Sequence, residues 1–288
     1  MSAVAVSSPS RAARLFGLCW RRKAASVGAI VTLLVVLAAI FAPWLTHLDP
    51  NEQDIAAQLL GPSAEHLLGT DTYGRDVWAR ILYGARVSLF IGVVSIALAM
   101  LIGGLLGLVA GYKGGRTERV IMSVMDMMLS FPSLVMGLLV VAVLGPSMAN
   151  LIIAISFTAI APFARIARAP TLAVRQRDFV EAGRALGYSD LRLMLRHILP
   201  NILDEILVLG SLWLATAIRT EASLSFIGLG VRPPTATWGG MIRDGFENML
   251  DAPWLVIFPS IAILIIMIAL NLLGDGLRDA TDPKLRNE

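Results

Sequence analysis

The residues with the most chemical potential lie together in one polar segment, DFVEAGRALGYSDLRLMLRHILPN, which runs from Asp178 to Asn201. Its acidic and basic side chains recur among leucines at helical spacing, a pattern typical of amphipathic helices. Asp178 and Glu181, three residues apart, match a capping box, in which side chains bond the free backbone groups at a helix start. We therefore expect this segment to bind another surface and to carry out no covalent chemistry.

The other candidate motifs for catalysis or metal binding are incomplete. GLVAGYKGG has the glycines of a phosphate-binding loop but lacks its Gly-Lys-Ser/Thr ending. The three histidines, His47, His66 and His197, are too scattered for a metal site. The sequence predicts no ATPase site, no cofactor and no metal in this chain.

A second polar motif, LGTDTYGRD, ends at Asp76. Its two glycines and two aspartates indicate a tight, hydrogen-bonded turn. The aspartates could also be taken for a metal or catalytic pair, but the structural role is preferred. The residues of this motif that we single out are Gly69, Thr70, Asp71, Gly74, Arg75 and Asp76.

The elements that must position these residues are membrane helices. The chain of 288 residues is 56% hydrophobic and only 16% charged, a composition outside the soluble range. Its mean hydropathy is +0.73. A span needs roughly 20 apolar residues. We expect an all-α polytopic fold of about six spans, at 24–45, 87–112, 125–144, 150–168, 202–222 and 252–274.

The first span is predicted to remain in the protein. Its apolar run is longer than a secretory signal core, and no small-residue cleavage pair precedes Pro43. Cys19, the single cysteine, is interpreted as a free thiol without a disulfide partner in the chain.

The distribution of lysine and arginine predicts the orientation, because basic loops remain in the cytoplasm. With the amino terminus inside, eighteen basic residues fall in inner segments and four in outer ones. The sequence thus predicts cytoplasmic tails at 1–23 and 276–288, an outer segment at 46–85, a main transmembrane domain at 86–275 and a cytoplasmic loop at 175–201. This bias already explains the net charge of +3, so no nucleic-acid partner is needed.

The cytoplasmic loop is expected to form two short helices at an angle. The first would bury Phe179, Ala182 and Leu186 and end at Gly187. The second would be capped by Ser189, carry a stripe of Leu191, Met194, Leu195 and Ile198, and be interrupted at Pro200. Three interpretations compete: an interfacial pair on the lipid surface, a helix-turn-helix DNA reader, and a docking element for a soluble partner.

Several motifs resemble one protein family. EAGRALG, followed twelve residues later by LPN, is similar to the EAA loop of ABC importer permeases. LGTDTYGRDVWARILYGARVSLFIG, GYKGGRTERVIMSVMDMMLSFPSLVM, EASLSFIGLGVRPPTATWGGMI and NLLGDGLRDATDPKLR resemble the dipeptide/oligopeptide permease subfamily, in its C-type subunit. These blocks follow in order over about three-quarters of the chain.

The resemblance implies the transmembrane domain of a type I ABC importer in a bacterial inner membrane. Its implied partners are a homologous B-type permease, two ATP-binding subunits that hold ATP and magnesium, and a periplasmic substrate-binding protein. The implied ATPase-docking residues are Glu181, Ala182, Gly183, Arg184, Gly187 and Pro200. Glu181 keeps two interpretations, closing the helix cap or contacting the ATPase.

The sequence departs from the family pattern at several positions. Gly183 replaces an alanine, which lowers helix propensity by up to about 1 kcal/mol but permits close approach. Charged residues, Arg219 among them, occupy positions of the fifth span that are usually apolar. The expected substrates are dipeptides or oligopeptides, with nickel or another small solute as the alternative. A membrane scaffold without transport is the alternative from another class.

Two patterns within the spans complete the predictions. Gly103, Gly107 and Gly111 recur every fourth residue and should allow close helix packing. Arg219 and Glu221 should face protein or a watery cavity, because charges facing lipid are costly. They are either substrate-pathway residues or a mutually neutralising pair.

Overall fold

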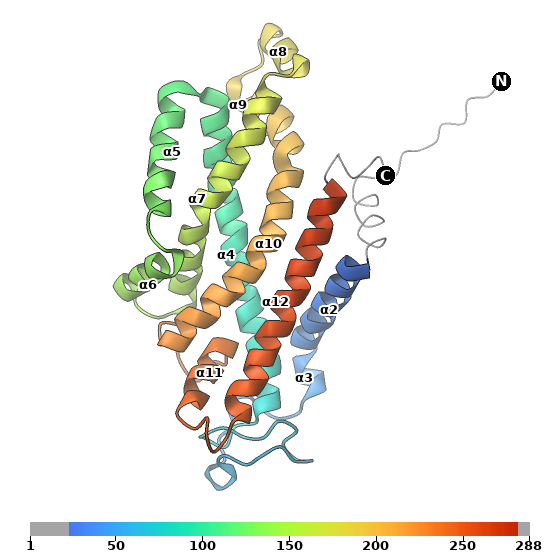
Figure 1. Ribbon diagram of the computed structural model, residues 1–288, viewed down its shortest axis with the longest axis vertical. Coiled ribbons are helices and arrows are strands. Elements are labelled where there is room, and N and C mark those ends of the chain that lie inside the picture. Colours follow the sequence, from blue (N-terminus) through green and yellow to red (C-terminus); the bar gives the residue numbers. More distant parts are fainter. Residues whose placement is uncertain (1–22, 282–288) are drawn as a thin grey trace, which may run out of the picture.

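The computed structural model describes residues 23–281, and all regular structure in this range is helical (Figure 1). The helices are α2 (Lys23–Ile40), α3 (Ala42–Leu45), η1 (Ile55–Ala57), α4 (Val77–Lys113), α5 (Gly115–Leu129), α6 (Ser133–Leu144), α7 (Met148–Arg175), α8 (Asp178–Ala185), α9 (Asp190–Arg192), η2 (Leu193–Ile198), α10 (Leu199–Ile227), α11 (Trp238–Phe246) and α12 (Trp254–Thr281).

Within residues 23–281, five helical stretches are long and apolar enough to cross a membrane. They are α2, α4, α7, α12 and the continuous run Asp190–Ile227, and the bent pair of α5 and α6 raises the number to as many as six. The predicted all-α polytopic fold is confirmed. The second of these spans begins earlier than expected, because Asp76 caps α4 and accepts a hydrogen bond from the Ala79 amide at 2.7 Å.

The stretch expected to form one span at 125–144 is instead two helices that meet at 91°. Phe131 precedes Pro132, and a residue before proline is disfavoured in the helical region. Ser130 ends α5 and donates its hydroxyl to the Met127 carbonyl at 2.6 Å. With 12 residues, α6 is about 18 Å long and cannot cross the hydrocarbon core alone.

The glycines on α4 pack against α7, as their spacing predicts. A Cβ atom at Gly103 or Gly107 would overlap the carbonyl oxygens of Ile160 and Ala164. A Cβ atom at Gly111 would lie 2.8 Å from that of Thr171. Because the contacts advance together along both helices, α4 and α7 run parallel, with their backbones in close contact.

The remaining long helices surround this pair. On α10, Ile206 lies beside Gly104 and Ile218 beside Gly92, so this helix runs antiparallel to α4. Helix α2 packs on α12, where a Cβ atom at Gly28 would lie 2.8 Å from that of Leu272.

The two ends of the molecule differ in character. Helices α8 and α9 form one end, while α11 and the segment between α3 and α4 form the other (Figure 1). Helix α2 begins, and α12 ends, toward the end that carries α8 (Figure 1). The polar sequence motifs therefore lie at opposite ends of a helical bundle.

Candidate functional site

Helix α8 starts without the expected capping box. Arg177 occupies the cap position with an extended backbone, and no side chain bonds the helix start. Asp178 is already the first helical residue, and Glu181 lies in the same turn. Their negative carboxylates instead interact favourably with the positive, amino-terminal end of the helix dipole. Glu181 is exposed and its carboxylate remains available for other contacts.

Gly187 terminates helix α8, as predicted, from the position directly after the cap residue Leu186. Gly187 has a φ of +76°, the left-handed conformation that glycine adopts at low cost. The Tyr188 amide donates to the Gly183 carbonyl at 3.0 Å, and the Gly187 amide donates to the Arg184 carbonyl at 2.9 Å. These two bonds form a Schellman motif, which satisfies carbonyls at the helix end.

The buried face of α8 is not the predicted one. Val180 and Gly183 point inward, whereas Phe179 is 43% exposed and Leu186 is 72% exposed. Ala182 is exposed as well. Gly183 explains the difference: a Cβ atom there would lie 2.8 Å from Leu193, so glycine lets α8 rest on η2 by this side. The expected core residues instead form an exposed apolar face.

The second helix of the loop does not end at Pro200. Ser189 caps it as predicted, accepting from the Arg192 amide at 3.4 Å, but the helix continues through η2 into α10. The η2 segment is a π-helix, whose wider turn accommodates the missing amide of Pro200 and the bulk of its ring. Pro200 is exposed in the first turn of α10. The loop therefore contains one separate helix and one extension of a span.

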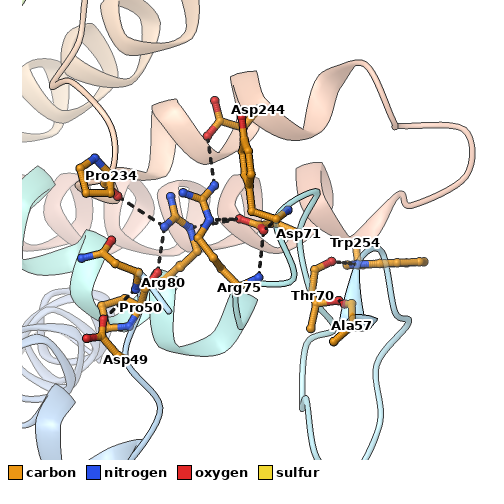
Figure 2. A network of polar contacts seen from close by, with 12 residues as sticks. Asp49, Pro50, Ala57, Thr70, Asp71, Arg75, Arg80, Pro234, Asp244 and Trp254 are labelled. Carbon is orange, nitrogen blue, oxygen red and sulfur yellow. Dashed lines mark hydrogen bonds and ion pairs between the residues drawn. The ribbon is translucent and has the colours of Figure 1, made fainter. Parts of the chain in front are cut away.

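At the opposite end, Asp71 organises a buried polar network (Figure 2). Its Oδ1 accepts from the Tyr73 and Arg75 amides at 2.8 and 3.0 Å. Its Oδ2 contacts Arg75 Nε at 2.7 Å and Arg80 Nε at 3.5 Å. Arg80 also donates to the Pro50 carbonyl at 2.9 Å. The predicted structural role of the turn is consistent with this geometry.

Further bonds tie the turn to distant segments. Thr70 donates its hydroxyl to the Ala57 carbonyl at 2.5 Å, and its own carbonyl accepts from Trp254 Nε1 at 3.2 Å. Asp76 Oδ2 lies 3.0 Å from His66 Nδ1. Gly69 and Gly74 have φ values of +80° and +71°, which the turn requires.

Asp244, on α11, joins the network from a distant part of the sequence. Its Oδ2 lies 3.7 Å from Arg75 Nη2 (Figure 2). Burial raises the pKa of Asp244 above its ordinary value, and the guanidinium groups of Arg75 and Arg80 act in the opposite direction. The network thereby connects this turn with α11.

Glu221 and Arg219 are separated by the helix. Glu221 is fully buried, and its Oε1 accepts from the Ser225 hydroxyl at 2.7 Å. Arg219 is exposed on another side of α10. Side chains two positions apart do not face each other on a helix, so the mutually neutralising pair is not supported by this geometry.

Several residues of these sites carry no signal in the sequence. Asp244 pairs with Arg75 across more than half of the chain, and Tyr112 on α4 bonds Asp190 on α9. Burial, which only the structure shows, explains why Arg80 and Tyr112 have partners, because charged and phenolic groups seek partners when buried. Among residues 23–281 no group of three or more His, Cys, Asp or Glu side chains could hold a metal ion.

The fold and its two polar ends define a polytopic helical membrane protein. Residues 103–287 match the family described as binding-protein-dependent transport system inner membrane component, and the chain belongs to this family. Residues 20–62 match the N-terminal transmembrane domain of oligopeptide transport permease C. These matches confirm the family resemblance seen in the sequence motifs.

The similarity to named relatives extends over nearly the whole chain. The dipeptide transport system permease protein of Alkalihalophilus pseudofirmus is 42% identical over 93% of this chain and 88% of its own length. The di/tripeptide transport system permease protein of Pseudomonas aeruginosa is 43% identical over 92% and 89%. The glutathione transport system permease protein of Pectobacterium atrosepticum is 42% identical over 93% and 91%.

Solved structures support the same fold. An inward-facing structure of the MetNI methionine ABC transporter matches with a TM-score of 0.58 at 16% identity, covering 72% of this chain and 98% of that chain. The chain thus has a fold found in an ABC transporter.

Proposed function

We propose that this chain is the C-type permease subunit of an importer for dipeptides and oligopeptides, driven by separate ATP-binding subunits that dock on α8. The observation that carries the proposal is the exposed apolar face of α8, formed by Phe179, Ala182 and Leu186. An apolar face at a polar end of a membrane protein marks an interaction site. The permease relatives named above support the peptide substrate.

The arrangement of the loop suits a cleft on a soluble partner. Burying the exposed parts of Phe179 and Leu186 would each contribute on the order of 1–2 kcal/mol. Glu181 and Arg184 are exposed beside this face and supply charges for polar contacts at its edge. Gly183 and Gly187 act indirectly, by setting how α8 sits on η2 and where it ends.

The remaining partners follow from the two ends of the bundle. The arginine-rich end would face the cytoplasm of a bacterium, with both chain termini on that side. The outer segment and α11 would face the periplasm, where a substrate-binding protein delivers its ligand. A homologous B-type permease would complete the pathway within the inner membrane, and ATP and magnesium would bind to the partner ATPases only.

Co-purification tests the docking surface. Leu186→Asp and Phe179→Asp should abolish retention of the co-expressed ATP-binding subunits, because a charge replaces an apolar contact that must become buried. Arg116→Asp, which places an acid on the exposed first turn of α5 at the same end of the molecule, is the matched control.

Two outcomes would contradict the proposal. Full retention of the ATP-binding subunits by both α8 variants would exclude this face as the docking surface. Wild-type complexes that hydrolyse ATP but do not accumulate labelled dipeptides, and instead accumulate nickel, would reject the peptide substrate.

A further inference from the structure

Tyr112 connects the inner end of α4 to the loop that carries α8. Its hydroxyl donates to Asp190 Oδ1 at 2.7 Å, across 78 residues of sequence. The guanidinium carbon of Arg184 lies 5.4 Å from the centre of its ring, within the range of a cation–π contact. One side chain of a membrane span therefore contacts both α8 and α9.

The rest of this loop is held mainly by α10. Val180 and Gly183 seat α8 on η2, which continues into α10. The guanidinium carbon of Arg192 lies 4.0 Å from the centre of the Tyr188 ring. The same ring stacks with His197, and the two ring centres are 5.5 Å apart. Through these contacts the loop should move together with α10, whereas Tyr112 attaches it to α4.

Helix α4 leads directly to the opposite end of the molecule. With 37 residues it is about 55 Å long, and its first turn carries the Asp76 cap and the buried Arg80 of the outer network. It also packs along α7 through Gly103, Gly107 and Gly111. A displacement of its inner end would therefore be carried along a stiff helix to the outer face.

We propose that Tyr112 is a positioning residue for transport, and that its contacts with Asp190 and Arg184 couple movement of the docking loop to α4. This inference rests on the proposed docking of ATP-binding subunits at α8. The coupling belongs to the hydroxyl group and the ring face; the body of the ring packs in the same apolar core as Val180 and Leu193. The hydroxyl's part of the coupling, its bond to Asp190, can thus be removed while the packing and the ring face toward Arg184 are retained.

The test uses the full complex in proteoliposomes. The binding protein and the labelled dipeptide are on the membrane side opposite the ATPase subunits, and ATP is on the side of these subunits. Uptake and ATP hydrolysis are measured in the same vesicles. Tyr112→Phe keeps the ring and removes the hydrogen bond, and Asp190→Ala removes the acceptor. Tyr83→Phe, the same change near the other end of α4, is the matched control.

We expect Tyr112→Phe to retain the ATPase subunits and their basal hydrolysis but to lower peptide uptake per ATP hydrolysed by about tenfold, the effect of one hydrogen bond to a charged group. Asp190→Ala should have the same effect, and the double variant should be no worse than either single variant. Tyr83→Phe should behave like the wild type.

Three results would overturn this inference. Unchanged uptake per ATP in Tyr112→Phe would show that the bond carries no coupling. A parallel loss of uptake and hydrolysis would indicate a general structural role, and loss of the ATPase subunits would place Tyr112 in docking itself. By contrast, a wild-type chain that binds no ATPase subunit would refute the proposed docking, on which the inference depends.

Discussion

At the scale of single residues, Glu221 stands out because its carboxyl side chain is completely excluded from solvent. It is fully buried with one carboxylate oxygen bonded to Ser225 and the other, Oε2, without a hydrogen-bond partner among the described residues. Its neighbour Arg219 is exposed. The two residues should therefore respond very differently to substitution.

We expect Glu221→Ala to lower the free energy of unfolding by about 2–4 kcal/mol, because it leaves a cavity and an unpaired Ser225 hydroxyl. Glu221→Gln, which keeps the shape, should be close to the wild type in stability. Arg219→Leu should leave both stability and uptake unchanged. Thermal unfolding in detergent and peptide uptake measure these effects; loss of uptake in a stable Arg219→Leu variant would instead favour a pathway role for the arginine.

The raised pKa of Asp244 predicts a pH dependence. Because burial lifts this pKa above its ordinary value, the folded protein holds the proton more tightly than the unfolded chain. The contribution to stability is complete below the ordinary pKa and is lost as the pH rises through the raised one. Arg75, Arg80 and Arg243 oppose the shift, and Asp71 adds to it.

The melting temperature of the wild type minus that of Asp244→Asn should therefore fall as the pH rises from about 4. Thermal unfolding at a series of pH values measures it. Asp251→Asn, an exposed carboxylate in the turn after α11, is the control for losing one acid at this end. A difference that grows with pH would show that the arginines, and not burial, dominate at Asp244.

At the scale of elements, the close contact between α4 and α7 is the one that the sequence predicts most clearly. Gly107 lies against Ala164 and Ala167, whereas Gly104, on another face of the same helix, has only Ile206 at 3.7 Å from an added Cβ. Gly107→Ala should destabilise the protein by about 1–3 kcal/mol through overpacking. Gly104→Ala should be neutral or stabilising by up to about 1 kcal/mol, since alanine favours the helix. Thermal unfolding of the pair distinguishes them, and equal melting temperatures would argue against close α4–α7 packing.

The end of α8 offers a second test at this scale. Nothing lies within 4 Å of a Cβ atom added to Gly187, so a side chain there meets backbone strain but no steric obstacle. Gly187→Ala should weaken the helix end by about 1–2 kcal/mol and reduce uptake. Gly187→Asn, which tolerates the left-handed conformation better, should recover part of the loss. Equal uptake in the two variants would show that the strain does not reach the docking surface.

At the scale of the whole molecule, the asymmetry of its two ends predicts the membrane orientation. In a Cys19→Ser background, Glu65→Cys on the outer segment should react with a membrane-impermeant maleimide in spheroplasts. Arg177→Cys, beside α8, should react only after the membrane is opened. The reverse pattern would invert the proposed topology.

The sequence by itself determined the features that depend on local chemistry. Long apolar runs predicted the membrane helices, glycines at every fourth position predicted a close helix contact, and Gly187 and Ser189 marked a helix end and a helix start. These signals are local because hydrophobic length, backbone freedom and capping act within a few residues.

The tertiary structure decided what local patterns leave open. The face of α8 that is buried, the continuation of η2 into α10 past Pro200, and the 91° bend between α5 and α6 depend on neighbours or on competing local preferences. The contacts of Arg75 with Asp244 and of Tyr112 with Asp190 join segments whose proximity no spacing reveals. They form because buried polar groups must find partners, and only the packed bundle determines which partners lie within reach.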